Sequence, residues 1–229
     1  MSYKKLATFD IDKTLSRQFL ITPIIQSEEE SGFVASGTHE RSMRVLEAVK
    51  SGQLEYEEAA HNLLVVHAEG LKGQRIADLG KHARDYLGKH AELFRSFAVP
   101  TTKLLRSTHE LVAVTAEPEY MARAVAETLG IDRVISSEYE VCEGVFTGKL
   151  AVSLAHRSEK RRLIGDLRPD LAFGDSAGDI EMLEHAHNAF CISPDAVLLA
   201  KAQACGWKVF DGDSDAESIL SSVRFLAES

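Results

Sequence analysis

From about residue 110 to its end, the chain alternates short apolar runs with longer segments of helical periodicity. Short apolar runs bounded by turn residues are typical of buried strands, and the helices between them supply the crossovers of a parallel sheet. The expected strands lie at 111–115, 133–136, 171–174, 189–192 and 208–210. The expected helices lie at 119–129, 158–167, 179–185, 195–205 and 216–227. This alternation predicts an α/β fold with a doubly wound, mainly parallel sheet, and the glycines within 139–149 predict a hairpin.

The N-terminal half differs because only one apolar strand is recognisable there, at residues 6–9. Residues 16–38 contain a proline and two glycines and are expected to be irregular. The following stretch has helical spacing, with helices expected at 41–50, 56–69, 76–87 and 91–97. We therefore predict two units: an α/β core formed by residues 1–17 and 98–229, and an inserted helical cap formed by residues 18–97.

The composition limits which partners the chain can bind. A net charge of −9 and a pI of about 5.5 work against nucleic acid or an anionic membrane as the main partner. The three cysteines are far apart and predict neither a disulfide framework nor a zinc site. The N-terminus leads directly into the first strand, and no apolar run approaches membrane-spanning length. We expect a cytoplasmic protein that acts on a small molecule, and its oligomeric state is left open.

Two carboxylates, Asp10 and Asp12, directly follow the first strand. Side chains two positions apart in extended chain project to the same side, where two carboxylates repel each other unless a cation relieves the repulsion. Carboxylate oxygens are ligands that Mg²⁺ prefers, so a divalent metal is one interpretation. The alternative is that both residues are ordinary polar members of a strand-to-loop turn.

Further polar groups stand near the ends of other predicted strands. Thr115 and Ala116 follow the second strand, the segment 174–179 follows another, and Lys160 lies near the start of a helix. Each has a simple alternative. Thr115 can satisfy its own backbone, Lys160 belongs to a charge run typical of a solvated helix face, and Asp179 can cap a helix. Because the carboxyl ends of parallel strands meet at one edge of a sheet, their joint occurrence favours a single site.

These residue types suit the transfer of a phosphoryl group. Asp10 would attack phosphorus as the nucleophile, and Asp12 would protonate the leaving oxygen and then deprotonate a water. A divalent cation held by Asp10 and Asp175 would lower the repulsion between carboxylate and phosphate. The Thr115 hydroxyl and the Ala116 amide would hold phosphoryl oxygens, and Lys160 would neutralise the charge on those oxygens.

In order and spacing, these motifs resemble those of the haloacid dehalogenase superfamily of phosphohydrolases, and the insert resembles that of its phosphoserine phosphatase branch. The matching stretches are 10–15, Thr115, Lys160 and 174–179. The resemblance implies a magnesium-dependent phosphatase that forms an aspartyl-phosphate on Asp10 and acts on a small phosphorylated metabolite. The implied metal ligands are Asp10, Asp12 through its backbone carbonyl, and Asp175. Asp179 would support the metal directly or through water, and the second and third motifs would bind phosphate.

At three positions the chain departs from that branch. Phe19 aligns with the glutamate that binds the substrate's amino group, His61 with the arginine that binds its carboxylate, and Gly178 with an asparagine. This predicts a substrate other than phosphoserine. The candidates for substrate selection are Arg17, Gln18, Arg41, Arg44 and His61, whose alternative is a solvated or packed helix position. A phosphotransferase or mutase and a non-catalytic regulatory module are the alternative functions on this fold.

Overall fold

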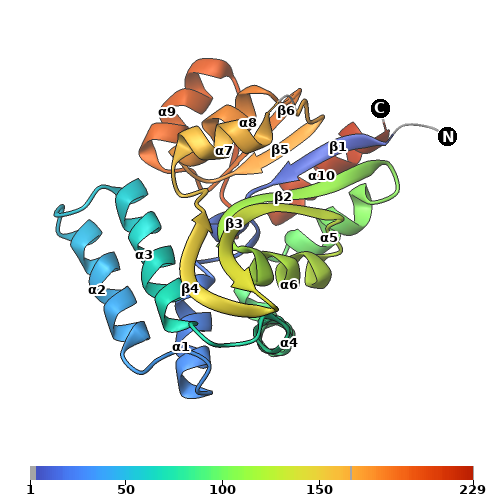
Figure 1. The fold of residues 1–229 in the computed structure, drawn as a ribbon. Coiled ribbons are helices and arrows are strands. Elements are labelled where there is room, and N and C mark those ends of the chain that lie inside the picture. The colour runs from blue at the N-terminus through green and yellow to red at the C-terminus, as the bar shows by residue number, and fades with distance from the viewer. Residues whose placement is uncertain (1–3, 166, 229) are drawn as a thin grey trace.

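The computed structural model describes residues 4–165 and 167–228. Within them, a seven-stranded sheet has the order β4-β3-β2-β1-β5-β6-β7 (Figure 1). The strands are β1 (Lys5–Phe9), β2 (His109–Pro118), β3 (Arg133–Cys142), β4 (Val145–Val152), β5 (Leu171–Gly174), β6 (Asn188–Ile192) and β7 (Lys208–Phe210). Neighbours pair in parallel except β3 and β4, which form an antiparallel hairpin. The predicted doubly wound, mainly parallel sheet is confirmed.

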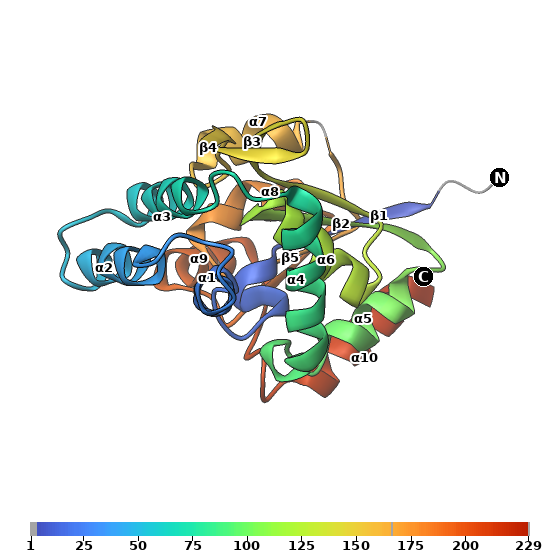
Figure 2. The same cartoon turned by 60° about the horizontal axis from the view of Figure 1, so that its bottom comes forward.

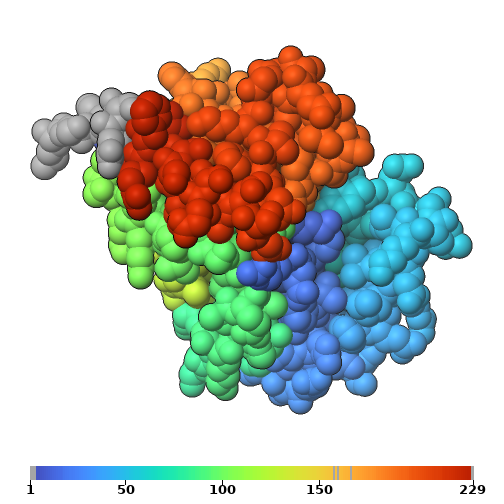
Figure 3. All heavy atoms as spheres, turned by 180° about the vertical axis from the view of Figure 1, so that it is seen from behind, coloured from blue at the N-terminus to red at the C-terminus, as the bar shows by residue number. Residues whose placement is uncertain are grey.

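The central strands are apolar on both faces because helices cover both. In β2, Leu111 and Ala113 belong to one apolar cluster, and Val112 and Val114 belong to another. The first cluster includes side chains of α5 (Ala98–Leu105), α6 (Glu119–Leu129) and α10 (Ala216–Glu228). The second includes side chains of α7 (Arg157–Ile164), α8 (Ile180–Glu184) and α9 (Ala196–Cys205). Figure 3 shows the red C-terminal helix lying over the green α5 segment.

Four helices are inserted between β1 and α5. They are α1 (Ile21–Glu30), α2 (Thr38–Lys50), α3 (Tyr56–Gly70) and α4 (Ile76–Lys89). Helices α2 and α3 lie side by side and project away from the sheet, whereas α4 packs against α6 (Figure 2). The expected helical insert is therefore present, and its division from the core at residues 17 and 97 stays a prediction.

Two expectations about this insert are wrong. Residues 16–38 are not irregular throughout, because α1 occupies Ile21–Glu30. Its proline, Pro23, lies in the first turn, where a missing amide N–H costs no helical hydrogen bond. The fourth expected helix is only a short turn at Ala91–Leu93, and the next full helix is α5. In the described ranges, no helix is both long and apolar enough to span a bilayer.

A buried polar cluster joins the insert to the core. His67 of α3 contacts the Glu28 carboxylate of α1 through Nε2 at 2.7 Å, and its Nδ1 lies 3.1 Å from the Tyr139 hydroxyl of β3. The Tyr120 hydroxyl of α6 donates to the other Glu28 oxygen at 2.5 Å. All four residues are buried. We call these residues the Glu28 cluster.

Candidate active site

The turn after β1 separates its two carboxylates. Asp10 lies at the strand end, where its backbone N–H donates to the Phe173 carbonyl of β5 at 2.9 Å. Lys13 adopts a left-handed conformation with φ of 56°, which costs a non-glycine residue about 1–2 kcal/mol. The Asp12 carboxylate accepts a hydrogen bond from the Leu20 N–H at 2.9 Å. Backbone strain of this kind is often found at functional sites, and here it shapes the turn that carries both aspartates.

The loop after β5 holds Asp179 in a fixed position. One of its carboxylate oxygens accepts hydrogen bonds from the backbone N–H groups of Asp175 and Ser176, both at 3.1 Å, and from the Ser176 hydroxyl at 3.2 Å. A Cβ on Gly174 would stand 2.5 Å from the Asp179 Cβ, so only glycine allows this approach. Asp179 therefore closes a capping box with Ser176 on the short turn that begins at Ala177. Its side chain makes no capping hydrogen bond to α8, the helix that follows, so its simple alternative as a cap of that helix is wrong.

Lys160 is not on a solvated helix face. Its side chain is buried, and Nζ lies 2.5 Å from the second oxygen of Asp179 and 3.3 Å from Oδ1 of Asp10. Burial alone would lower the pKa of this ammonium group, but the carboxylates of Asp179 and Asp10 more than offset it and raise the pKa. Lys160 is therefore a charged group held between two strand ends.

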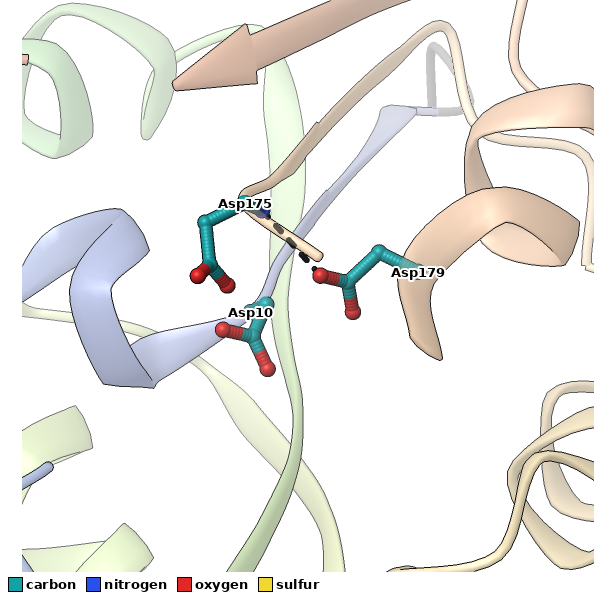
Figure 4. A group of neighbouring side chains, drawn as sticks. All are labelled: Asp10, Asp175 and Asp179. Carbon is teal, nitrogen blue, oxygen red and sulfur yellow. Dashed lines mark hydrogen bonds between the residues drawn. The ribbon is translucent and has the colours of Figure 1, made fainter. Parts of the chain in front are cut away.

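Three buried carboxylates converge at this point. One oxygen each of Asp10, Asp175 and Asp179 lies within 4.8 Å of the others. Figure 4 shows Asp10 and Asp175 turned toward one another with Asp179 beside them. Burial, and then the Asp179 carboxylate, raise the pKa of Asp10 well above its ordinary value. Burial, and then the Asp10 carboxylate, raise the pKa of Asp175 to about 9. We call these residues, with Lys160, the acidic cluster.

The acidic cluster fits a divalent metal. Three carboxylates face one lysine there, so negative charge is in excess, and carboxylate oxygens are hard ligands of the kind that Mg²⁺ prefers. The two Asp179 oxygens are already engaged by Lys160 and the loop amides, which leaves Asp10 and Asp175 to offer oxygens. The Asp12 carboxylate is not one of the three, and the ligand role that the sequence resemblance implied for its backbone carbonyl stays a prediction.

A cavity of about 610 Å³ opens above the acidic cluster. Asp10, Asp12, Ala116, Lys160 and Asp175 all line it. Thr115, which was predicted to bind phosphate, does not line this cavity. Its side chain is fully buried, and its hydroxyl accepts a hydrogen bond from the backbone N–H of residue 117 at 3.1 Å. The structure thus brings together the residues of three motifs, and the phosphate-binding role of Thr115 stays a prediction.

The five predicted selectivity residues do not line this cavity. Arg17 pairs with Asp213, whereas Arg41 pairs with Glu69 and Arg44 with Glu40 on the surface. Gln18 is exposed. His61 lies 3.1 Å from the Ser153 hydroxyl and lines a different cavity. None of the five lies at the wall of the cavity above the acidic cluster, and their role in substrate selection stays a prediction.

Glu117 is a site residue that the sequence reasoning missed. It is buried, accepts from the Ile21 N–H at 2.9 Å and interacts with the Asp12 carboxyl group. Burial raises its pKa to about 7, although hydrogen bonds to Asp12 and the Ile21 amide lower it. The signal in the sequence was an acidic residue two positions beyond the expected end of an apolar strand. Burial raises the pKa of the neighbouring Asp12 well above its ordinary value, and the negative charge of Glu117 beside it adds to this rise.

Comparison with known proteins agrees with this arrangement. The model of the haloacid dehalogenase-like hydrolases matches residues 7–184, which include every residue of the acidic cluster. The chain belongs to this family.

Several relatives are named as hydrolases or phosphatases. A putative hydrolase of Mycobacterium leprae is 31% identical over 62% of this chain and 50% of its own length. The phosphoserine phosphatase of Archaeoglobus fulgidus is 27% identical over 97% of this chain and 60% of its own length. The phosphoserine phosphatase of Methanocaldococcus jannaschii is 24% identical over 88% of this chain and 92% of its own length. This chain spans half of the M. leprae protein and 34% of two Mycobacterium tuberculosis relatives.

Solved structures share the fold. A Bordetella pertussis protein of unknown function superposes with a TM-score of 0.75 at 21% identity, covering 92% of this chain and 99% of its own. A substrate-bound phosphoserine phosphatase complex has a TM-score of 0.64 at 21% identity, covering 97% and 99%. At such identities, these likenesses show the fold alone.

Proposed function

We propose that this protein is a magnesium-dependent phosphatase that hydrolyses a small phosphomonoester through an aspartyl-phosphate on Asp10. The observation that carries the proposal is the acidic cluster, in which the buried Lys160 ammonium lies 3.3 Å from Asp10 at the floor of a cavity. The relatives named phosphoserine phosphatase support the same reaction class.

The described residues account for each bond change. An Asp10 oxygen attacks phosphorus, and the bond from phosphorus to the substrate's ester oxygen breaks. Asp12 lines the cavity, and its raised pKa keeps a proton available for that leaving oxygen. Asp12 then takes a proton from the water that attacks the phosphorus, which releases phosphate and restores Asp10. Lys160 neutralises charge on the phosphoryl oxygens while Asp179 holds its ammonium group in place.

The metal would be held by the carboxylates of Asp10 and Asp175 and by the Asp12 carbonyl. When bound, Mg²⁺ lowers the repulsion between the attacking carboxylate and the phosphate dianion. Asp12 cannot share this task through its side chain, because that carboxyl group is turned toward Leu20 and Glu117.

The test is to trap the covalent intermediate. Wild type mixed with p-nitrophenyl phosphate and Mg²⁺, then quenched in acid, should carry one added phosphoryl group that hydroxylamine removes. Mass spectrometry of the peptide with Asp10 should locate it there. Asp10→Asn should show neither label nor turnover, whereas Asp78→Asn, on the exposed side of α4, should match wild type. Turnover without a label on Asp10 would contradict the mechanism, and phosphate appearing on an added alcohol would favour a phosphotransferase.

A further inference from the structure

A second cavity, of about 360 Å³, adjoins the one above the acidic cluster. The two cavities lie side by side, because both are lined by Asp12, Lys13, Phe19, Tyr56, Ala60 and Ala116. We call the second cavity the side pocket. It lies between helices α2 and α3 of the insert and the turn that carries Asp12. Pockets of this size commonly hold small molecules.

The side pocket is mainly apolar. Beyond the shared residues, its wall consists of Ile21, Leu46, Val49, Ala59, Leu63 and Leu64, together with Lys50 and Glu117. Lys50 is exposed at the end of α2, whereas Glu117 is buried. A group that fills this space gives up water for aliphatic side chains, which favours hydrocarbon over charged groups.

The boundary between the two cavities is aromatic. The rings of Phe19 and Tyr56 lie with centroids 6.2 Å apart, and the Lys13 ammonium lies 4.3 Å from the Phe19 centroid. The two rings therefore offer an apolar surface to a leaving group that passes from one cavity to the other.

The apolar wall of the side pocket disfavours a leaving group with a carboxylate. Among the described residues that line the side pocket, the cations are Lys13, whose ammonium lies over the Phe19 ring, and Lys50, which is exposed at the end of α2. A carboxylate on the leaving group would exchange water for aliphatic side chains there, which is costly.

On the basis of the phosphatase function above, we propose that the substrates are phosphomonoesters of apolar, uncharged alcohols. The phosphate lies at the acidic cluster, and the hydrocarbon part of the leaving group enters the side pocket between α2 and α3. Each methylene buried there should raise kcat/KM about fourfold until the pocket is filled.

The test compares ethyl, butyl, pentyl, hexyl and octyl phosphate with phosphoserine and with an ω-carboxybutyl phosphate. The expected kcat/KM rises along the alkyl series, and the carboxylated esters fall at least about tenfold below pentyl phosphate of matched length. Val49→Asp should flatten the alkyl series, because Val49 lines only the side pocket. Val65→Asp is the matched control, since Val65 of α3 lines a different cavity, and it should keep the wild-type dependence.

The outcomes separate the inference from the phosphatase function. Hydrolysis that depends on Asp10 but is flat or falls with chain length, or that favours phosphoserine, overturns the inference and leaves the phosphatase standing. If no ester is hydrolysed, the phosphatase proposal fails, and binding decides: octylphosphonate should stabilise wild type against heat more than ethylphosphonate. Equal stabilisation overturns the inference. The wild-type series alone is decisive if Val49→Asp does not fold.

Discussion

The Glu28 cluster and the acidic cluster are both buried, but they differ in how far the protein completes them. In the first, each Glu28 oxygen has a hydrogen-bond partner, and both ring nitrogens of His67 are in contact with polar groups. In the second, three carboxylates gather around Lys160, and the pKa values of Asp10 and Asp175 are raised. A completed network adds rigidity, whereas uncompensated buried charge marks a place prepared for a ligand.

Asp10→Asn should break this comparison most sharply, because it should reduce activity without reducing stability. Loss of the nucleophile is expected to lower kcat/KM on the order of 10³-fold or more. In metal-free buffer, removal of one of three adjacent buried carboxylates should leave the free energy of unfolding in urea equal to or above that of wild type. A clear loss of stability would show that the ion pair between Asp10 and Lys160 serves the fold, and the contrast would fail.

Glu28→Ala should show the reverse pattern. It removes the partner of both His67 and Tyr120, and breaking a buried pair in this way costs about 3–5 kcal/mol. The folded fraction should keep its kcat/KM, since the Glu28 cluster does not line the cavity above the acidic cluster. Urea unfolding and steady-state rates measure the two effects. Glu30→Ala, at an exposed position of the same helix, should stay within about 0.5 kcal/mol of wild type.

The sequence predicted the acidic cluster better than the Glu28 cluster, and the reason is physical. Asp10, Lys160 and Asp175 stand near apolar strands or at a helix start, and the topology of a parallel sheet brings such positions together. Glu28 gave no such signal, because it lies in an acidic run within a stretch that we expected to be irregular. Its burial depends on how α1 packs against α3 and α6, which is long-range information.

The same limit applies to side-chain positions within the site. The Asp12 carboxyl group was expected beside that of Asp10, but the left-handed Lys13 and the amide of Leu20 direct it elsewhere. The proposed selectivity residues were chosen as charged or polar groups near the first motif or in the insert, yet their partners lie outside the cavity. Strand ends follow from local pattern, whereas side-chain partners on an inserted domain do not.

Glu117→Gln sharpens the comparison at the border of the site. The pKa of Glu117 is about 7 in the folded protein and near its ordinary value of 4.5 when unfolded. The folded state therefore binds the proton more tightly, and wild-type stability should fall as pH rises from about 4.5 to 7. The variant escapes this loss, so its advantage should grow to about 3 kcal/mol at neutral pH in metal-free buffer. Urea unfolding at several pH values measures it. The exposed Glu217→Gln should show no such trend.

Bound Mg²⁺ should compensate the negative charge of the acidic cluster, as hydrogen bonds already compensate that of Glu28. A metal that binds only the folded state stabilises it by about 2.7 kcal/mol at a hundred times its Kd, and thermal unfolding at constant ionic strength measures this shift. Asp175→Asn should lose most of the shift because it removes a ligand oxygen. Glu28→Ala should keep the shift although the variant is less stable, since the two clusters share no residue. An equal shift in wild type and Asp175→Asn would place the metal elsewhere, and the excess charge of the acidic cluster would then need another partner.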